Sequence, residues 1–140
     1  MRSVIIAVFI SLFVAGFSFA AVTAIPEIKE VINTRSGIKY TSYVDGTGAS
    51  PGPSDTVRVN YRGTLPNGRE FDSSYKNGGS VEFQLGSVIK CWTEGLQLMK
   101  VGGKAELECP ANLAYGDRGV SGSIPPFSSL TFEIELLNVR

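Results

Sequence analysis

The 140-residue sequence predicts a single α+β domain, in which a curved antiparallel sheet of about five strands wraps around one short α-helix. Two observations support this prediction. Several segments alternate apolar and polar residues, which is the period-2 pattern of strands with one buried face. Only one segment has helical periodicity, since Trp92, Leu96 and Met99 are spaced i, i+4 and i+7. Because one short helix cannot cover both faces of a flat sheet, we expect the sheet to curve around the helix.

The first expected strands lie in the N-terminal half. Residues 38–44 carry apolar side chains on one side and are followed by a loop rich in Gly, Ser and Pro at 47–54. The segment VRVNY at 57–61 has the most regular alternation. After it, Asn67-Gly68 favours a tight hairpin turn, and the chain returns from Phe71.

The remaining elements follow the same reasoning. Val81, Phe83 and Leu85 alternate with polar residues, and the helical segment that comes next is expected to end at Gly102-Gly103. Two more alternating segments complete the sheet. The expected strands are therefore 38–44, 57–61, 81–85, 105–109 and 130–136.

The N-terminus has the pattern of a targeting segment. Arg2 is its only charged residue before Glu27, residues 4–14 are almost entirely apolar, and small residues follow. We expect signal-peptide cleavage after Ala20 or Ala24. The alternative is an uncleaved signal anchor, because the apolar run is nearly long enough to cross a bilayer.

This pattern divides the chain into three parts and places the protein outside the cytoplasm. The middle part is expected to be a tether, although its EIKEVI patch has the composition of a helical turn. A tether this short suggests no dimerisation domain, so we expect a periplasmic or secreted monomer with no membrane contact after cleavage. The parts are a signal peptide at 1–24, a tether at 25–36 and a folded domain at 37–140.

The composition excludes several classes of function. The chain has 13 basic and 13 acidic residues with no basic stripe, so nucleic acid is not an expected partner. It contains no histidine, which excludes Ser-His-Asp catalysis, Cys-His catalysis and histidine metal sites. We therefore expect no metal and no cofactor.

Four motifs occur in order over most of the chain. They are VRVNYRGTL with REFDSSY, then VIKCWTEGLQLMKVGGK, then LAYGDRG, and finally IPPFSSLTFEIELL. With these motifs the chain resembles the FKBP-type peptidyl-prolyl cis-trans isomerases, the macrolide-binding immunophilins. The resemblance implies the same curved-sheet fold, proline-containing polypeptides as substrates, and macrolides such as tacrolimus or rapamycin as ligands.

The resemblance also implies an apolar cup for the proline ring. Trp92 would form its floor, and the walls would come from several other elements. Trp92 stands at the start of the helix, where a side chain can face a cleft, whereas Phe83 and Phe132 also fit regular strand alternation and are equally well read as core residues. The implied wall residues are Tyr61, Phe71, Phe83, Val88, Ile89, Ile124 and Phe132.

Two polar side chains are implied beside the cup. Asp72 would contact the substrate carbonyl region or bond a tyrosine hydroxyl; the alternative is a turn aspartate ahead of Ser73. On an extended chain, Asp72 would point to the side opposite Phe71. Tyr115 would donate its hydroxyl to a substrate carbonyl, and the alternative is an ordinary buried tyrosine. The backbone N–H of Ile89 would bind a second carbonyl.

The two cysteines, Cys91 and Cys109, are too far apart in sequence for a C-x-x-C redox pair. Cys91 lies at the helix entry and Cys109 points inward from an expected strand. In an oxidising compartment we expect a disulfide between them, and the alternative is two free buried thiols.

Two functions fit these residues. An apolar cup lowers the barrier to X-Pro rotation, because the planar amide separates more charge than the twisted one and loses more when water is removed. An isomerase could therefore act without acid–base or covalent chemistry. The alternative is a module or holdase chaperone that grips proline-containing segments with little turnover.

Overall fold

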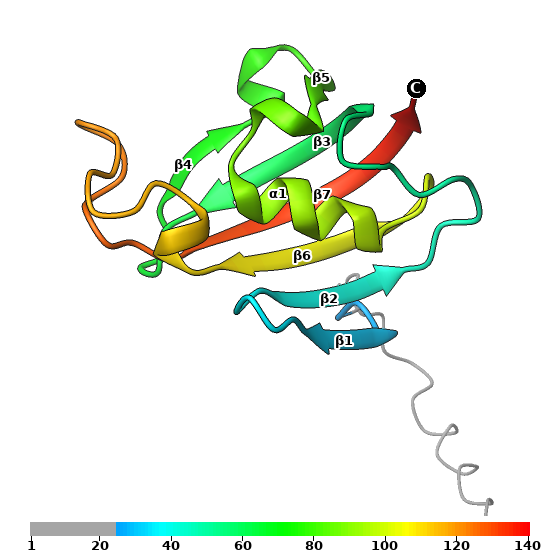
Figure 1. Cartoon of the computed structure of the whole chain (residues 1–140), viewed down its shortest axis with the longest axis horizontal. Coiled ribbons are helices and arrows are strands. Elements are labelled where there is room, and N and C mark those ends of the chain that lie inside the picture. Colours follow the sequence, from blue (N-terminus) through cyan, green and yellow to red (C-terminus); the bar gives the residue numbers. More distant parts are fainter. Residues whose placement is uncertain (1–24) are drawn as a thin grey trace, which may run out of the picture.

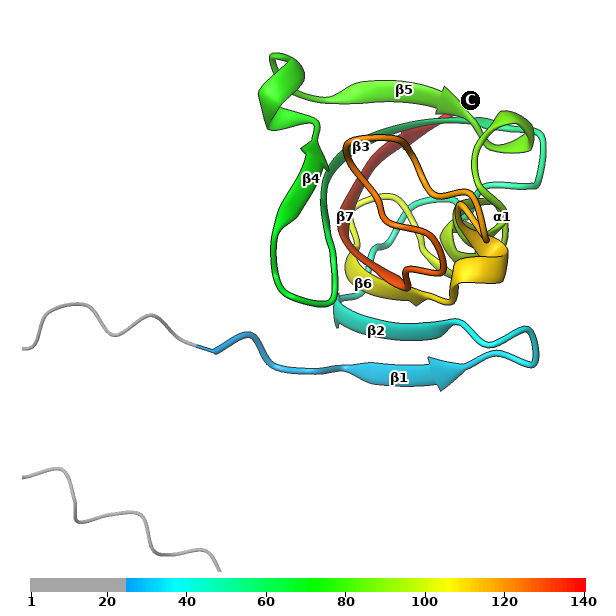
Figure 2. The same cartoon turned by 90° about the vertical axis from the view of Figure 1, so that its left-hand side faces the viewer.

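The structure is a computed structural model that describes residues 25–140; the expected signal peptide lies outside the described residues. Its core is a seven-stranded sheet in which every named pairing is antiparallel, in the order β1-β2-β6-β7-β3-β4, with β5 also paired to β3. The sheet curls around a helix that lies on its concave side (Figures 1 and 2). The strands are β1 (Glu30–Asn33), β2 (Lys39–Val44), β3 (Thr56–Thr64), β4 (Glu70–Ser73), β5 (Val81–Gln84), β6 (Lys104–Cys109) and β7 (Leu130–Val139).

The predicted fold class is confirmed, but the sheet has seven strands among the described residues rather than about five. The additional strands are β1 and β4. β1 forms within the expected tether, where Val31 pairs with Thr41 and Ile32 with Tyr40, so the prediction of a helical turn in EIKEVI is wrong. Ile32 packs against the core, and this burial stabilises an edge strand that has no regular alternation of its own.

The centre of the sheet confirms the period-2 reading. Along β3 buried residues alternate with half-buried ones, so that Val57, Val59, Tyr61 and Gly63 all face the concave side. β3 and β7 pair over most of their length, with Tyr61 opposite Ile134. This alternation fills the concave side with apolar side chains and leaves the convex side polar.

The helix is shorter than its apolar spacing predicts. α1 covers Lys90–Gly95, and the chain continues as a 3-10 turn, Leu96–Leu98, before the glycine pair. Gly95 faces the sheet so closely that a Cβ there would lie 2.6 Å from Leu107 Cδ1. The helix therefore packs directly on β6.

No helix within residues 25–140 is long and apolar enough to cross a membrane. The other 3-10 turns are η2 (Tyr75–Asn77), η3 (Leu85–Ser87) and η5 (Ala111–Leu113).

A disulfide joins Cys91 to Cys109, with 5.8 Å between their Cα atoms, as the sequence predicts. Both cysteines are fully buried. The bond ties the first turn of α1 to the last residue of β6. It therefore fixes the helix to the sheet directly beside Trp92.

Candidate functional site

The concave side of the sheet carries a cluster of aromatic rings around Trp92. The ring centroids of Tyr61, Phe83 and Phe132 lie 5.1, 5.4 and 5.3 Å from that of Trp92, and each ring is nearly perpendicular to the indole. Phe71 extends the group, with its ring 5.7 Å from Phe132 and again nearly perpendicular. Edge-to-face contacts of this kind make the indole a floor and the other rings its walls.

The rings come from separate elements that the fold brings together. Tyr61 lies on β3, Phe83 on β5 and Phe132 on β7, while Trp92 is in the first turn of α1. Val88 and Ile89 immediately precede that turn and, like Phe71 and Phe83, are partly buried against the hydrophobic core of the domain. Ile124, from the loop before β7, is buried in the same core.

Burial differs between the floor and the rim. Trp92 is only 4% exposed, and Tyr61, Phe132 and Ile124 are buried with it. The other wall residues keep partial contact with solvent. Water therefore reaches the cluster at its rim and scarcely at the indole. The half-buried wall residues are Phe71, Phe83, Val88 and Ile89.

The indole nitrogen is the one polar atom in this floor. Trp92 Nε1 is buried and is the only buried side-chain nitrogen or oxygen among residues 25–140 that lacks a hydrogen-bond partner. A buried donor left unpaired costs about 1–3 kcal/mol. Every other contact of the floor described above is aromatic.

Gly63 makes room for two of the wall rings, and sequence analysis gave no reason to single it out. A Cβ at Gly63 would lie 2.6 Å from Phe71 Cζ and 2.9 Å from Phe132 Cε1. Any side chain there would force the two rings apart. The signal in the sequence is a glycine at an inward position of an otherwise regular strand, which indicates close approach of another group.

Phe71 and Asp72 both reach the concave side, so the expectation that they point to opposite sides is wrong. Asp72 pairs with Gly63 across the β3–β4 ladder, and Glu70 pairs with Thr64, so Phe71 has no partner residue opposite it. This register shift is a β-bulge, which places one extra residue in a strand and redirects its side chains. The bulge brings an aromatic ring and a carboxylate to the same side from adjacent positions.

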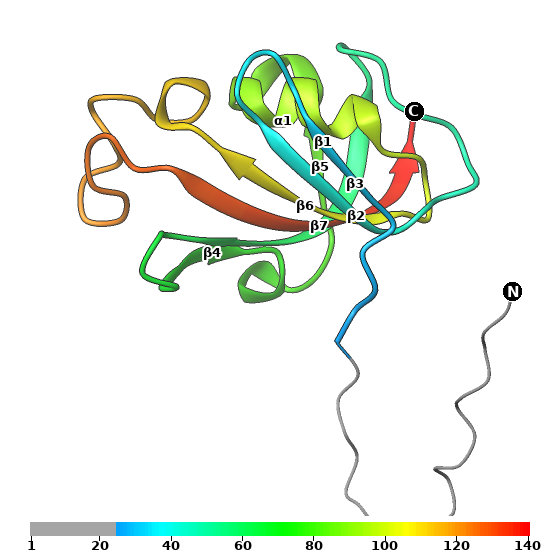
Figure 3. The same cartoon turned by 90° about the horizontal axis from the view of Figure 1, so that it is seen from below.

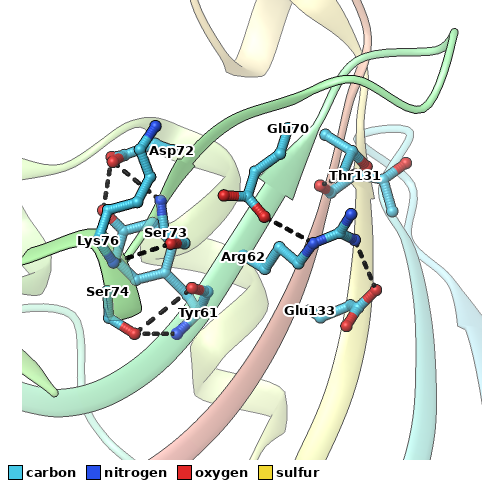
Figure 4. A network of polar contacts seen from close by, with 10 residues as sticks. Tyr61, Arg62, Glu70, Asp72, Ser73, Ser74, Lys76, Thr131 and Glu133 are labelled. Carbon is cyan, nitrogen blue, oxygen red and sulfur yellow. Dashed lines mark hydrogen bonds and ion pairs between the residues drawn. The ribbon is translucent and has the colours of Figure 1, made fainter. Parts of the chain in front are cut away.

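Asp72 is fixed by two hydrogen bonds. Its Oδ2 accepts a 2.6 Å bond from the Tyr61 hydroxyl, and its Oδ1 accepts a 2.9 Å bond from the backbone N–H of Ser73. Both alternatives considered from the sequence therefore occur together, since Asp72 bonds a tyrosine and also shapes the turn. Figure 4 shows Asp72 in one polar group with Tyr61, Ser73 and Ser74.

Ser74 holds the backbone of Tyr61 in place and is a second residue that sequence analysis did not identify. It is fully buried, and its Oγ accepts a 2.9 Å bond from the Tyr61 N–H. The Ser74 N–H in turn donates to the Tyr61 carbonyl at 3.0 Å. Tyr61 is thus anchored at its backbone by Ser74 and at its hydroxyl by Asp72.

The electrostatics of the site keep its phenols protonated. Burial raises the pKa of Tyr61 well above its ordinary value of 10, and the hydrogen bond to Asp72 raises it further. Burial and the nearby charge of Asp72 also raise the pKa of Tyr115. Both hydroxyls therefore remain hydrogen-bond donors at and above neutral pH.

Tyr115 lies at the rim rather than in the aromatic cluster. It is 41% exposed, and its hydroxyl makes no hydrogen bond to another residue within 25–140. The Ile89 N–H likewise donates to no other described residue, although the Ile89 carbonyl accepts the first bonds of α1. Two donors with unused capacity thus stand beside the apolar cluster.

A second candidate is a hollow of about 660 Å³ on the other side of the sheet, and Tyr61 is the only residue of the aromatic cluster that lines it. Its lining mixes tyrosines with charged side chains, including Tyr43, Tyr75, Arg62, Glu106 and Glu133. Arg62 is already paired there, 2.8 Å from Glu70 and 3.4 Å from Glu133 (Figure 4). Charged side chains retain water more strongly than aromatic rings do, so the aromatic cluster is the better candidate site for excluding water.

Comparisons with known proteins agree with the sequence resemblance. A family model described as FKBP-type peptidyl-prolyl cis-trans isomerase matches residues 48–137. The chain is 50% identical over 112 residues to the FKBP-type peptidyl-prolyl cis-trans isomerase FkpA of Escherichia coli K12, covering 80% of this chain and 41% of FkpA. It is also 50% identical over 105 residues to the outer membrane protein MIP of Legionella longbeachae, covering 75% and 45% of the two chains.

A solved structure has the same fold. The crystal structure of FkpA from Escherichia coli matches with a TM-score of 0.75 and 50% identity, over 79% of this chain and 51% of that one. The chain therefore spans about half the length, or less, of these relatives.

Proposed function

The chain belongs to the FKBP-type peptidyl-prolyl cis-trans isomerases, and we propose that it accelerates rotation about X-Pro peptide bonds in exported polypeptides. The observation that carries the proposal is the set of perpendicular rings around Trp92 together with the Tyr61–Asp72 hydrogen bond at their edge. This arrangement offers an apolar seat for a pyrrolidine ring and a small number of fixed polar contacts beside it.

The chemistry follows from the nature of the barrier. Rotation about the amide costs roughly 18–20 kcal/mol, because it breaks the resonance between nitrogen and carbonyl. The planar amide separates more charge than the twisted one, so removing water penalises the planar state more. Rings that exclude water from the amide therefore lower the barrier, and no proton needs to move.

The polar groups would hold the substrate rather than react with it. The Tyr115 hydroxyl and the Ile89 N–H are donors without partners among the described residues, and each is suited to one substrate carbonyl. Asp72 would stand near the amide, but its Oδ2 is already occupied by Tyr61. Its role would be to fix the phenol and to set the electrostatic potential around the twisting bond.

The competing function is a module that binds proline-containing segments without useful turnover. Exchange NMR on a Leu-Pro-Phe peptide with the full chain separates the two functions. We expect faster cis-trans exchange at catalytic protein concentration. Binding of the peptide with an unchanged exchange rate would leave only the binding module.

The same measurement tests the polar contacts. Asp72→Ala and Tyr115→Phe are each expected to slow the catalysed exchange by about 2–13-fold, the effect of one hydrogen bond of about 0.5–1.5 kcal/mol. Tyr75→Phe is the matched control, because Tyr75 is an exposed tyrosine on the other side of the sheet. Wild-type rates in both site variants would contradict these roles.

The proposal extends to location and ligands. Export fits the N-terminal apolar segment, the disulfide and the similarity to a protein named as an outer membrane protein. The protein would act as a monomer on proline-containing chains. Macrolides such as tacrolimus or rapamycin would compete for the same aromatic seat.

A further inference from the structure

Phe127 has an unusual backbone conformation. Its φ is 59°, and it is the only residue other than glycine with a positive φ in the part of the chain that the structure describes. A bulky side chain in this region clashes with its own backbone, at a cost of order 1–3 kcal/mol. Glycine, or to a lesser extent Asn and Asp, would take this conformation more easily.

The loop holds Phe127 firmly in this conformation. The Phe127 N–H donates a 2.9 Å bond to the Gly116 carbonyl, and the Ser128 Oγ donates a 2.7 Å bond to the Pro125 carbonyl. Pro125 and Pro126 precede it and restrict the backbone on the other side. The strain is therefore a fixed feature of the loop.

The folded domain gains no packing from this strain. The Phe127 side chain is 76% exposed and is not part of the buried cluster. An exposed aromatic ring gives little hydrophobic stabilisation, because most of its surface stays in water. Neither packing nor backbone preference accounts for phenylalanine at this position.

Phe127 shares its loop with two other exposed apolar side chains, Tyr115 and Val120. Each of these residues is held by a backbone bond within the loop: the Phe127 N–H donates to Gly116, the Gly119 N–H to Tyr115 at 3.1 Å, and the Val120 N–H to Ile124 at 2.8 Å. The loop between η5 and β7 projects beyond the end of the sheet (Figures 1 and 3). The loop therefore runs from Ile124, which is buried in the core, to Phe127, which is exposed to solvent.

We propose that Phe127 is a second contact for the bound polypeptide. Its ring packs against an apolar or aromatic side chain of that polypeptide, at a position outside the X-Pro pair. This rests on the proposed function, since it assumes that a proline-containing chain occupies the cup. The Phe127 N–H donates to the carbonyl of Gly116, the residue that follows Tyr115, so the Phe127 backbone lies beside the segment that carries the polar edge of the cup. An extended chain advances about 3.4 Å per residue, so residues two or three positions from the proline lie about 7–10 Å along the chain and are the ones that would meet the loop.

The chemistry of the ring fits this role. Phenylalanine presents a large rigid surface with only two side-chain torsions, so little conformational entropy is lost when a partner side chain packs on it. The Phe127 side chain carries no charge, donor or acceptor, so its own contribution to binding comes from apolar contact.

The test uses two proline peptides and the full chain. One peptide carries leucine two and three residues from the proline on both sides, and the other carries serine at those positions. NMR titration gives the dissociation constant of each, whether or not the peptide is turned over. Wild-type protein is expected to bind the leucine peptide about 5–10-fold more tightly, which corresponds to roughly 1–1.4 kcal/mol.

The variant Phe127→Asn is expected to reduce this preference to less than twofold, while its unfolding temperature stays the same or rises because Asn tolerates the positive φ. Phe127→Tyr, which keeps the aromatic surface, is expected to retain the preference. An Asn variant that keeps the full preference would overturn the proposal. So would an Asn variant that unfolds at a clearly lower temperature, because Phe127 would then be a packing residue. Failure of the proposed isomerase function would be visible separately, as an unchanged exchange rate of the Leu-Pro-Phe peptide with wild-type protein.

Discussion

Replacing Trp92 by alanine is expected to lower the free energy of unfolding by about 3–5 kcal/mol and to reduce catalysed X-Pro exchange by at least tenfold. The stability loss follows from the cavity left by an indole that three perpendicular rings surround. The activity loss follows from the removal of the floor on which the proline ring would rest. Chemical denaturation and exchange NMR on the same samples measure the two effects.

Two further variants separate the site role of Trp92 from its packing role. Leu136→Ala removes a fully buried side chain of β7 that is not part of the aromatic cluster, so it should cost about 2–5 kcal/mol with little change in exchange rate while the protein is folded. Trp92→Phe keeps an aromatic ring at this position and removes the unpaired Nε1–H. It should therefore lower the free energy of unfolding by less than about 2 kcal/mol, which is less than Trp92→Ala. Folded Trp92→Ala protein with wild-type activity would remove the indole from the mechanism.

Opening the Cys91–Cys109 disulfide is expected to lower the free energy of unfolding by about 3 kcal/mol, from the chain entropy regained by the unfolded state. Their sequence separation is 18 residues, which sets the size of the closed loop. The unfolding temperature should fall by roughly 10 °C for a domain of this size. Thermal unfolding of oxidised protein and of protein reduced in denaturant and then refolded measures the difference.

The disulfide also bears on the site, because it fixes the turn that carries Trp92. The variant carrying both Cys91→Ala and Cys109→Ala serves as control, since it cannot re-oxidise. Both reduced and double-alanine forms should lose stability together. Equal unfolding temperatures for the oxidised and reduced forms, or two free thiols in the exported protein, would contradict this account.

Much of the fold follows from alternation that the sequence displays openly. The segment 57–61 and β7 have one apolar and one polar face, and a strand with that pattern has few other ways to bury its apolar side. β1 is different because EIKEVIN has no such pattern. Its pairing with β2 depends on the tertiary context, which no local pattern encodes.

The helix illustrates a second limit of sequence reasoning. Its apolar spacing continues through Met99, but the α-helical hydrogen bonding ends at Gly95 and a 3-10 turn follows. Gly95 permits close contact with Leu107 on β6, and this tight packing is a property of the folded sheet. Side-chain periodicity predicts which face is buried more reliably than where the helix ends.

The candidate site shows the same division. The aromatic residues could be selected from the sequence by family resemblance, and the structure brings Tyr61, Phe71, Phe83, Trp92 and Phe132 together. The bulge that turns both Phe71 and Asp72 inward could not be predicted from the sequence, because it depends on a register shift between β3 and β4. The positive φ of Phe127 was equally hidden, since no rule of local preference places phenylalanine there.

The central claim is that an apolar cup with a few fixed polar contacts lowers the barrier to X-Pro rotation without transfer of a proton. The most direct test is the pH dependence of catalysed exchange between pH 6 and 9. The chain has no histidine, and the raised pKa values of Tyr61 and Tyr115 keep both phenols protonated across this range. We predict a catalytic efficiency that changes by less than about twofold over these three pH units, where a single titrating acid or base would change it by tenfold or more. A sigmoidal or bell-shaped profile with a midpoint in this range would contradict the account.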